Sequence, residues 1–216
     1  GLATAAGILY MSFLNTGSTI NSFYSAIIAL IGVFVGYFYT AKPIRLSSRY
    51  GLGELSIFLS FGPLLTLGTG FAIANETILL FSNEFYNLLI LGVPIGLLTT
   101  NILFINQYPD HASDKKVGKN HLVVLLGKKS SRWIYGFNLI LALGSLYFIA
   151  ENLLIGTKQM LFFYVLIPIT MFYSYFLLSG LFKYYNSRKL VKYNIHTIYF
   201  HMLFSFIYMI ILANFQ

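Results

Sequence analysis

The stretch that decides the fold is residues 87–114, NLLILGVPIGLLTTNILFINQYPDHASD. Its uncharged part, 87–106, is long enough for a helix to cross the hydrocarbon core of a bilayer, which takes about 20 apolar residues. Its end is polar, because Asn106, Asp110 and Asp114 follow one another at intervals of four residues. Such positions share one face of a helix. We therefore expect a membrane helix that ends in a stripe of three oxygen-bearing side chains.

The composition of the whole chain agrees with an integral membrane protein. Of 216 residues, 57% are hydrophobic and only 9% are charged, whereas soluble domains contain about 25% charged residues. The net charge of +8 could indicate nucleic-acid binding, but the basic residues lie in short loops between apolar runs, as in membrane proteins. Cysteine is absent, which excludes disulfides.

Apolar runs without polar–apolar alternation favour helices over barrel strands. We expect an all-α, polytopic transmembrane bundle with seven visible segments, approximately 1–15, 22–40, 55–74, 87–106, 133–150, 160–181 and 195–214. The first is short for a spanning helix and does not begin with Met, so we interpret the chain as beginning inside a helix. The alternative is a short first helix in a complete mature chain.

The loops indicate the orientation in the membrane. All but one of the 14 lysines and arginines lie in loops 41–54, 107–132 and 182–194, and the exception is Lys158. By the positive-inside rule these three loops are cytoplasmic. We expect a multi-pass protein of the cell membrane with its C-terminus outside.

The stripe at 106–114 is the main candidate site. Asp110 and Asp114 are the only aspartates of the chain, and carboxylates at a helix C-terminus oppose the helix dipole. Mg²⁺ is usually held by one or two carboxylates together with substrate phosphates. We hypothesise that Asn106, Asp110 and Asp114 bind Mg²⁺, with both aspartates catalytic, for a phosphorylated substrate with an apolar tail. The alternative is a solvated loop in which Asp114 pairs with Lys115 or Lys116.

Other candidates lie on the same side of the membrane. Lys42 and Arg45 could neutralise a pyrophosphate, or be ordinary membrane anchors beside an interfacial Tyr39. Lys119, in a segment bounded by Gly118 and Gly127, is a further phosphate-binding candidate, unless that segment is an amphipathic one on the lipid surface.

Glu54 is either a carboxylate at a helix N-terminus or a contact in the polar pocket. The four histidines have no metal-binding spacing, and we interpret them as interfacial.

These residues resemble a known family. Residues 106–127, NQYPDHASDKKVGKNHLVVLLG, are similar to the second aspartate-rich motif of the UbiA superfamily of intramembrane prenyltransferases, roughly N-x-x-x-D-x-x-x-D-x-x-x-G-K-R-T-L-x-V-x-L-G. Residues 36–46 (GYFYTAKPIRL), 51–54 (GLGE) and 61–63 (FGP) resemble its menaquinone branch, which acts on 1,4-dihydroxy-2-naphthoate. The resemblance covers most of residues 30–130, and the last three segments are similar only in hydropathy.

Two departures from the family pattern are visible. Asn120 and His121 stand where the family usually has Arg-Thr, and no N-D-x-x-D motif precedes Tyr39. Since nine helices are usual, the resemblance implies that residues 1–216 are a single prenyltransferase domain without its first two helices and first metal motif. We expect such a chain to be inactive alone.

The resemblance implies Mg²⁺-dependent transfer of an isoprenyl chain from a prenyl diphosphate to an aromatic acceptor, within a helical bundle in membrane lipid. The substrate-binding residues would be Asn106, Tyr39, Lys42, Arg45, Lys119 and Glu54. The acceptor would be 1,4-dihydroxy-2-naphthoate, with 4-hydroxybenzoate or another lipid-quinone precursor as the alternative. A transporter and a catalytically dead fragment are further alternatives. Acids inside membrane spans often mark ion pathways, and because no acid of this chain is expected near the centre of a span, the enzyme is favoured.

Overall fold

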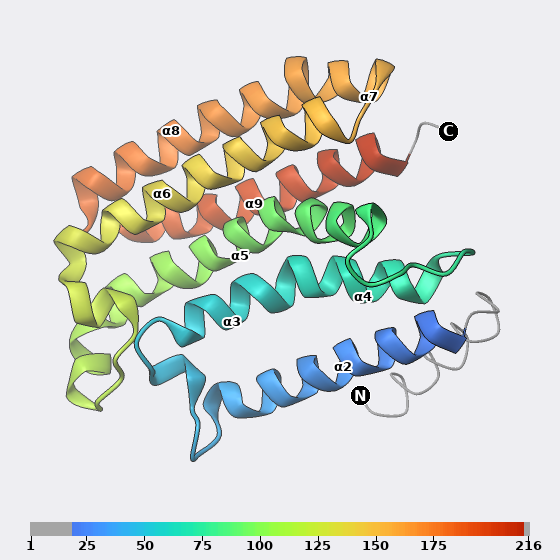
Figure 1. Cartoon of the computed structure of the whole chain (residues 1–216). Helices are drawn as coiled ribbons and strands as arrows, with labels where there is room; N and C mark the ends of the chain where they lie inside the picture. Colours follow the sequence, from blue (N-terminus) through green and yellow to red (C-terminus); the bar gives the residue numbers. More distant parts are fainter. Residues whose placement is uncertain (1–18, 214–216) are drawn as a thin grey trace.

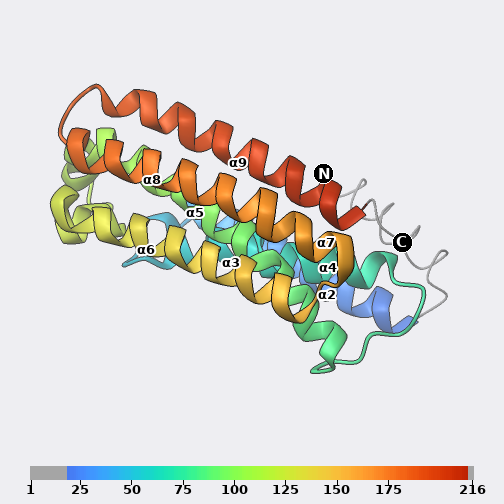
Figure 2. The same cartoon turned by 90° about the horizontal axis from the view of Figure 1, so that it is seen from above.

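The computed structural model describes residues 19–213, and the regular elements in that range are helices. They are α2 (Thr19–Thr40), a 3₁₀ turn (Leu46–Ser48), α3 (Leu52–Phe61), α4 (Pro63–Ile73), α5 (Asn83–Lys116), α6 (Leu122–Asn152), α7 (Gly156–Leu161), a π-helical turn (Phe162–Leu166), α8 (Ile167–Tyr184) and α9 (Leu190–Ala213). The helices run side by side along one direction, from α8 and α6 at one edge through α5 to α2 at the other (Figure 1). Seen at right angles, α9 lies along α8 (Figure 2).

Six helical stretches of the described range are long and apolar enough to cross a membrane: Thr19–Thr40, Leu52–Ile73, Asn83–Lys116, Leu122–Asn152, Gly156–Tyr184 and Leu190–Ala213. They confirm six of the seven expected segments and the all-α bundle. The expected segment 1–15 lies outside the described residues. The six acids lie in loops or within two turns of a helix end; as expected, none lies near the middle of a span.

Helix α5 is the central element, since it packs against α3, α4, α6 and α9. Its inner face is fully buried at Phe104, Ile105 and Tyr108. Because lipid is as apolar as these side chains, close packing and interhelical hydrogen bonds hold membrane helices together. One such bond joins Asn138 Nδ2 to Asn101 Oδ1 at 2.9 Å, between α6 and α5.

The expected segment 55–74 is two helices, because Gly62 ends α3 with non-helical dihedral angles and Pro63 begins α4. At this break the backbone lies against α5. A Cβ atom added to Gly62 would lie 2.7 Å from both Gly92 O and Gly96 Cα. Gly92 and Gly96 form a G-x-x-x-G pair, the spacing that allows close approach of membrane helices.

The expectation of a long loop at 107–132 is wrong. Helix α5 continues through Pro109 to Lys116 and α6 begins at Leu122, so the connection is only 117–121. The apolar run ends earlier than the helix, because a helix needs no apolar side chains once it leaves the hydrocarbon region. The helical intervals between Asn106, Asp110 and Asp114 are therefore preserved. The three basic connections lie at one end of the bundle (left in Figure 1).

Candidate active site

A cavity of about 340 Å³ lies at this basic end, between the last turns of α2 and α5. Its lining residues are Tyr39, Thr40, Arg45, Ser47, Leu103, Asn106, Gln107, Asp110, Asp114, Lys119 and His121. It brings together six of the candidate residues: Tyr39, Arg45, Asn106, Asp110, Asp114 and Lys119. Lys42 and Glu54 are not among the lining residues. The cavity thus brings Arg45, which follows α2, together with the acidic and basic groups at the end of α5 and in the connection after it.

The stripe on α5 faces this cavity over its whole length. Asn106 Oδ1 accepts a hydrogen bond from Asn194 Nδ2 of α9 at 3.0 Å. The Asp110 side chain is exposed, and among residues 19–213 its carboxylate has no hydrogen-bond or ion-pair partner. A carboxylate that no protein group neutralises is available to a cation.

Asp114 is held by two residues. Its Oδ1 accepts from Lys119 Nζ at 2.7 Å, and its Oδ2 lies 3.1 Å from His121 Nε2. The alternative in which Asp114 pairs with Lys115 or Lys116 is wrong, because neighbours one and two positions apart do not face each other on a helix. The real partners come from beyond the end of α5.

The connection 117–121 places these partners. Gly118 has a φ of +72°, which glycine adopts readily, and the turn returns the chain so that Lys119 N donates to Asp114 O at 3.0 Å. Asn120 then bonds the loop before α3, donating to Ser48 O at 3.1 Å and accepting from Tyr50 N at 2.8 Å. Gly127 also has a positive φ, of +75°, and interrupts α6, so the segment between the two glycines contains a short helix that is set off from the rest of α6.

His121 is the clearest omission among the candidates. The expectation of an interfacial histidine is wrong for His121, since only 2% of it is exposed and it lines the cavity. It is the N-cap of α6 and its side chain accepts from Val124 N. The sequence carries no standard N-cap signal at this position, because histidine is not among the residues favoured there. Gln107, also missed, lines the cavity from the stripe's own helix.

Glu54 connects three helices. It is buried in the first turn of α3, and its Oε1 accepts from Gln107 Nε2 at 3.1 Å and from Leu122 N at 3.0 Å. The structure thus places Glu54 behind the cavity wall, one contact away through Gln107. Lys42 is exposed outside the cavity.

The donor set at the cavity fits Mg²⁺. Among residues 19–213, no group of three or more His, Cys, Asp or Glu side chains is placed to hold a metal. Mg²⁺ does not need one, because it is usually bound through one or two carboxylates, with waters and substrate phosphates as the remaining ligands. The unpartnered Asp110, together with Asp114 and the amide of Asn106, offers the hard oxygen donors that this mode of binding requires.

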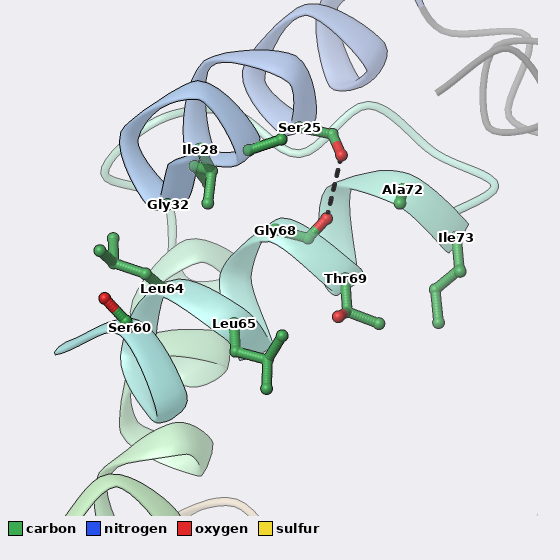
Figure 3. A pocket seen from close by; sticks show the side chains of 11 residues that line it. Ser25, Ile28, Gly32, Ser60, Leu64, Leu65, Gly68, Thr69, Ala72 and Ile73 are labelled. Carbon is green, nitrogen blue, oxygen red and sulfur yellow. Dashed lines mark hydrogen bonds between the residues drawn. The ribbon is translucent and has the colours of Figure 1, made fainter. Parts of the chain in front are cut away.

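A second cavity, of about 390 Å³, is apolar and lies between α2 and the α3–α4 pair (Figure 3). We call it the apolar groove. Ser25, Ala29 and Gly32 line it from α2, and Ser25 Oγ donates to Gly68 O at 3.3 Å across it. Along α2, this face continues at helical spacing to Tyr39 and Thr40 of the polar cavity.

Comparisons with known proteins show similarity over almost the whole chain. The pattern of the UbiA prenyltransferase family matches residues 1–210, so the match also covers the last three segments. The 2-carboxy-1,4-naphthoquinone phytyltransferase of Synechocystis is 34% identical over 150 residues, 68% of this chain and 43% of that protein. Two proteins named 1,4-dihydroxy-2-naphthoate octaprenyltransferase also match. That of Bacillus subtilis is 30% identical over 111 residues, 51% of this chain and 33% of its own. That of Escherichia coli is 35% identical over 96 residues, which are 44% of this chain and 28% of that protein.

In each case the matched stretch is less than half the length of the relative. No solved structure matches the chain significantly. The agreement in the family pattern over residues 1–210 is sufficient for assignment: the chain belongs to the UbiA prenyltransferase family.

Proposed function

We propose that the protein transfers an isoprenyl chain from a prenyl diphosphate to an aromatic acceptor, and that the acceptor is 1,4-dihydroxy-2-naphthoate. The observation that carries the proposal is a cavity with two aspartates, Arg45 and Lys119 at the polar end of an apolar bundle. The names of the relatives from B. subtilis and E. coli support the choice of acceptor.

The polar cavity would take the diphosphate. Asn106, Asp110 and Asp114 would hold Mg²⁺, which when bound supplies charge stabilisation to the departing pyrophosphate. Arg45 and Lys119 would donate to phosphate oxygens, and their positive side chains would stabilise the negative charge that develops as the allylic C–O bond breaks. Lys119 would exchange its contact with Asp114 for one with phosphate.

The rest of the cavity would favour carbon–carbon bond formation. The electron pair of the C–O bond leaves with pyrophosphate, and an electron-rich ring carbon of the acceptor attacks the allylic carbon. That ring carbon then loses the group it carried, a hydrogen as H⁺ or a carboxylate as CO2, and the ring becomes aromatic again. Tyr39 and Leu103 contribute an aromatic and an aliphatic wall, which limit the water that would otherwise react with the allylic cation.

The apolar groove is the proposed path of the prenyl tail. It follows the same face of α2 as the polar cavity, and the distance along the helix from Gly32 to Tyr39 is about 10 Å at 1.5 Å per residue. Its walls are mainly aliphatic, so burial of a hydrocarbon chain there removes apolar surface from contact with water near the head group.

Substitution of Gly32 tests this path. A Cβ atom at Gly32 meets nothing within 4 Å, so G32F should fold and fill the groove. We expect kcat/KM for a long-chain prenyl diphosphate to fall at least about tenfold, while geranyl diphosphate, whose tail ends earlier, is used at nearly the wild-type rate. The control is G144F on α6, which also faces open space but lies outside the groove. Equal losses for both donors in G32F would contradict the path.

The reaction itself is tested with the full-length protein in liposomes. It is supplied with Mg²⁺, a prenyl diphosphate and either 1,4-dihydroxy-2-naphthoate or 4-hydroxybenzoate, and products are identified by mass spectrometry. We expect Mg²⁺-dependent prenylation of the naphthoate. Prenylation of hydroxybenzoate alone would overturn the acceptor, and absence of product with either would overturn the function.

We further propose that the basic end of the bundle, with the polar cavity, is cytoplasmic. The charge asymmetry of the connections supports this orientation. Reporters fused in the turn between α8 and α9, at Ser187, should be cytoplasmic, whereas those placed after Gln216 or in the turn between α6 and α7 should be external. A cytoplasmic reporter after Gln216 would contradict this topology.

A further inference from the structure

We propose that His121 is a positioning residue, which orients the Asp114 carboxylate towards the cavity and keeps it there when Lys119 turns to the diphosphate. The inference rests on the proposed function, because it concerns the same cavity. It adds a role for a residue at which this chain departs from the family pattern.

The hydrogen bonds of His121 determine its tautomer. Val124 N donates to His121 Nδ1 at 3.4 Å, so in the neutral ring the proton is on Nε2. Nε2 is the atom that lies 3.1 Å from Asp114 Oδ2. His121 therefore donates to the carboxylate without requiring a positive charge. A neutral donor orients the carboxylate without competing electrostatically with a bound cation.

The ring cannot easily turn away. It is buried, and the backbone on each side of it is tied down: Asn120 bonds the loop before α3, and Leu122 N donates to Glu54 Oε1. His121 is thus a rigid support for Asp114, because both its ring and the backbone beside it are held by other parts of the fold.

Lys119 differs from His121 in two respects, because its side chain can move and it carries a positive charge. Its side chain is 35% exposed, and a lysine stem has four carbons that allow the ammonium to move. Its positive charge opposes binding of a cation to Asp114. When the ammonium moves to the diphosphate, Asp114 Oδ1 becomes free for metal and His121 remains as the anchor of Oδ2. The two partners of Asp114 therefore have separate roles.

Three substitutions distinguish positioning of Asp114 from capping of α6. In H121Q, the glutamine Nε2 can occupy the place of the histidine Nε2 and donate to Asp114, but the bond from Val124 N that caps α6 is lost. In H121N, the asparagine Oδ1 can replace Nδ1 as the cap, but its amide does not reach Asp114. H121L removes both interactions. H111L is the control, since His111 is a half-buried histidine at the same end of the bundle, outside the cavity lining.

The measurement is binding of Mn²⁺, in place of Mg²⁺, to the full-length protein with inorganic pyrophosphate, followed by electron paramagnetic resonance. Loss of a hydrogen-bonding partner behind a metal ligand typically weakens binding about 10–100-fold. We expect this loss in H121L and H121N, an affinity within about threefold of wild type in H121Q, and no change in H111L. Thermal unfolding is measured in parallel, and H121N, which keeps the cap of α6, should be destabilised less than H121L, which loses both hydrogen bonds.

The outcomes separate this inference from the proposed function. Wild-type affinity in H121L or H121N would overturn the role of His121, as would a loss in H121Q alone, which would indicate helix capping. If the wild type itself binds no Mn²⁺, or if D110N binds it equally well, the proposed metal site is wrong and the inference falls with it.

Discussion

Replacing Asp110 by asparagine in the full-length protein is expected to lower the rate of prenyl transfer at least about a hundredfold, because loss of one strong electrostatic stabiliser commonly costs 10²–10³ in rate. The substitution is nearly isosteric, and in the described part of the chain the Asp110 carboxylate has no partner to lose. The melting temperature should therefore stay at the wild-type value. A large loss of rate without a loss of stability would assign Asp110 to the chemistry.

Asp114→Asn should lower the rate to a similar extent but also affect the fold. The amide keeps one oxygen, so it cannot accept from both Lys119 and His121 as the carboxylate does. We expect a lower melting temperature for D114N than for D110N. E84Q is the control, because Glu84 is an exposed acid in the first turn of the same helix. Wild-type rates for D110N and D114N at saturating Mg²⁺ would refute the proposed site.

The contrast between these two aspartates shows what the sequence could and could not predict. The interval of four residues was enough to place both on one face of a helix, and the helix continues through Pro109 as that prediction required. Their different partners depend on the connection 117–121, whose path is decided by Gly118 and by backbone bonds to residues 48 and 50. Neither the turn at Gly118 nor these backbone bonds produce a periodic pattern in the sequence from which they could be predicted.

The bundle was predictable for a related reason. Spanning helices must satisfy their backbone hydrogen bonds internally, so each appears as a continuous apolar run. Ends of helices outside the hydrocarbon region leave no such signal, so the sequence predicts a loop where the polar end of α5 and the polar beginning of α6 are helical. The break within residues 55–74 did have a local signal, Gly62 followed by Pro63, because proline is favoured at the first position of a helix. The contact of that break with α5 joins residues that are distant in the sequence, so the sequence pattern alone does not predict it.

That contact should make Gly92→Ala strongly destabilising. A Cβ atom at Gly92 would overlap Thr66 Oγ1 and lie 2.5 Å from Gly62 C. Alanine normally stabilises a helix by about 1 kcal/mol relative to glycine, so the sign of the effect would be reversed here. Overpacking typically costs about 1–3 kcal/mol, and we expect at least the upper part of that range, because the Gly62 backbone cannot change rotamer as a side chain can.

The control is Gly144→Ala on α6, where an added Cβ meets nothing within 4 Å. Thermal unfolding in detergent should show an unchanged or higher melting temperature for G144A, and for G92A a lower melting temperature or no monodisperse folded protein. Separation of α3 from α5 would also weaken the bond between Gln107 Nε2 and Glu54 Oε1 behind the polar cavity. Any G92A protein that folds should therefore bind Mn²⁺ more weakly, although Gly92 lies about 27 Å along α5 from Asp110 at 1.5 Å per residue. A wild-type melting temperature for G92A would show that α3 and α4 can move away from α5 at little cost.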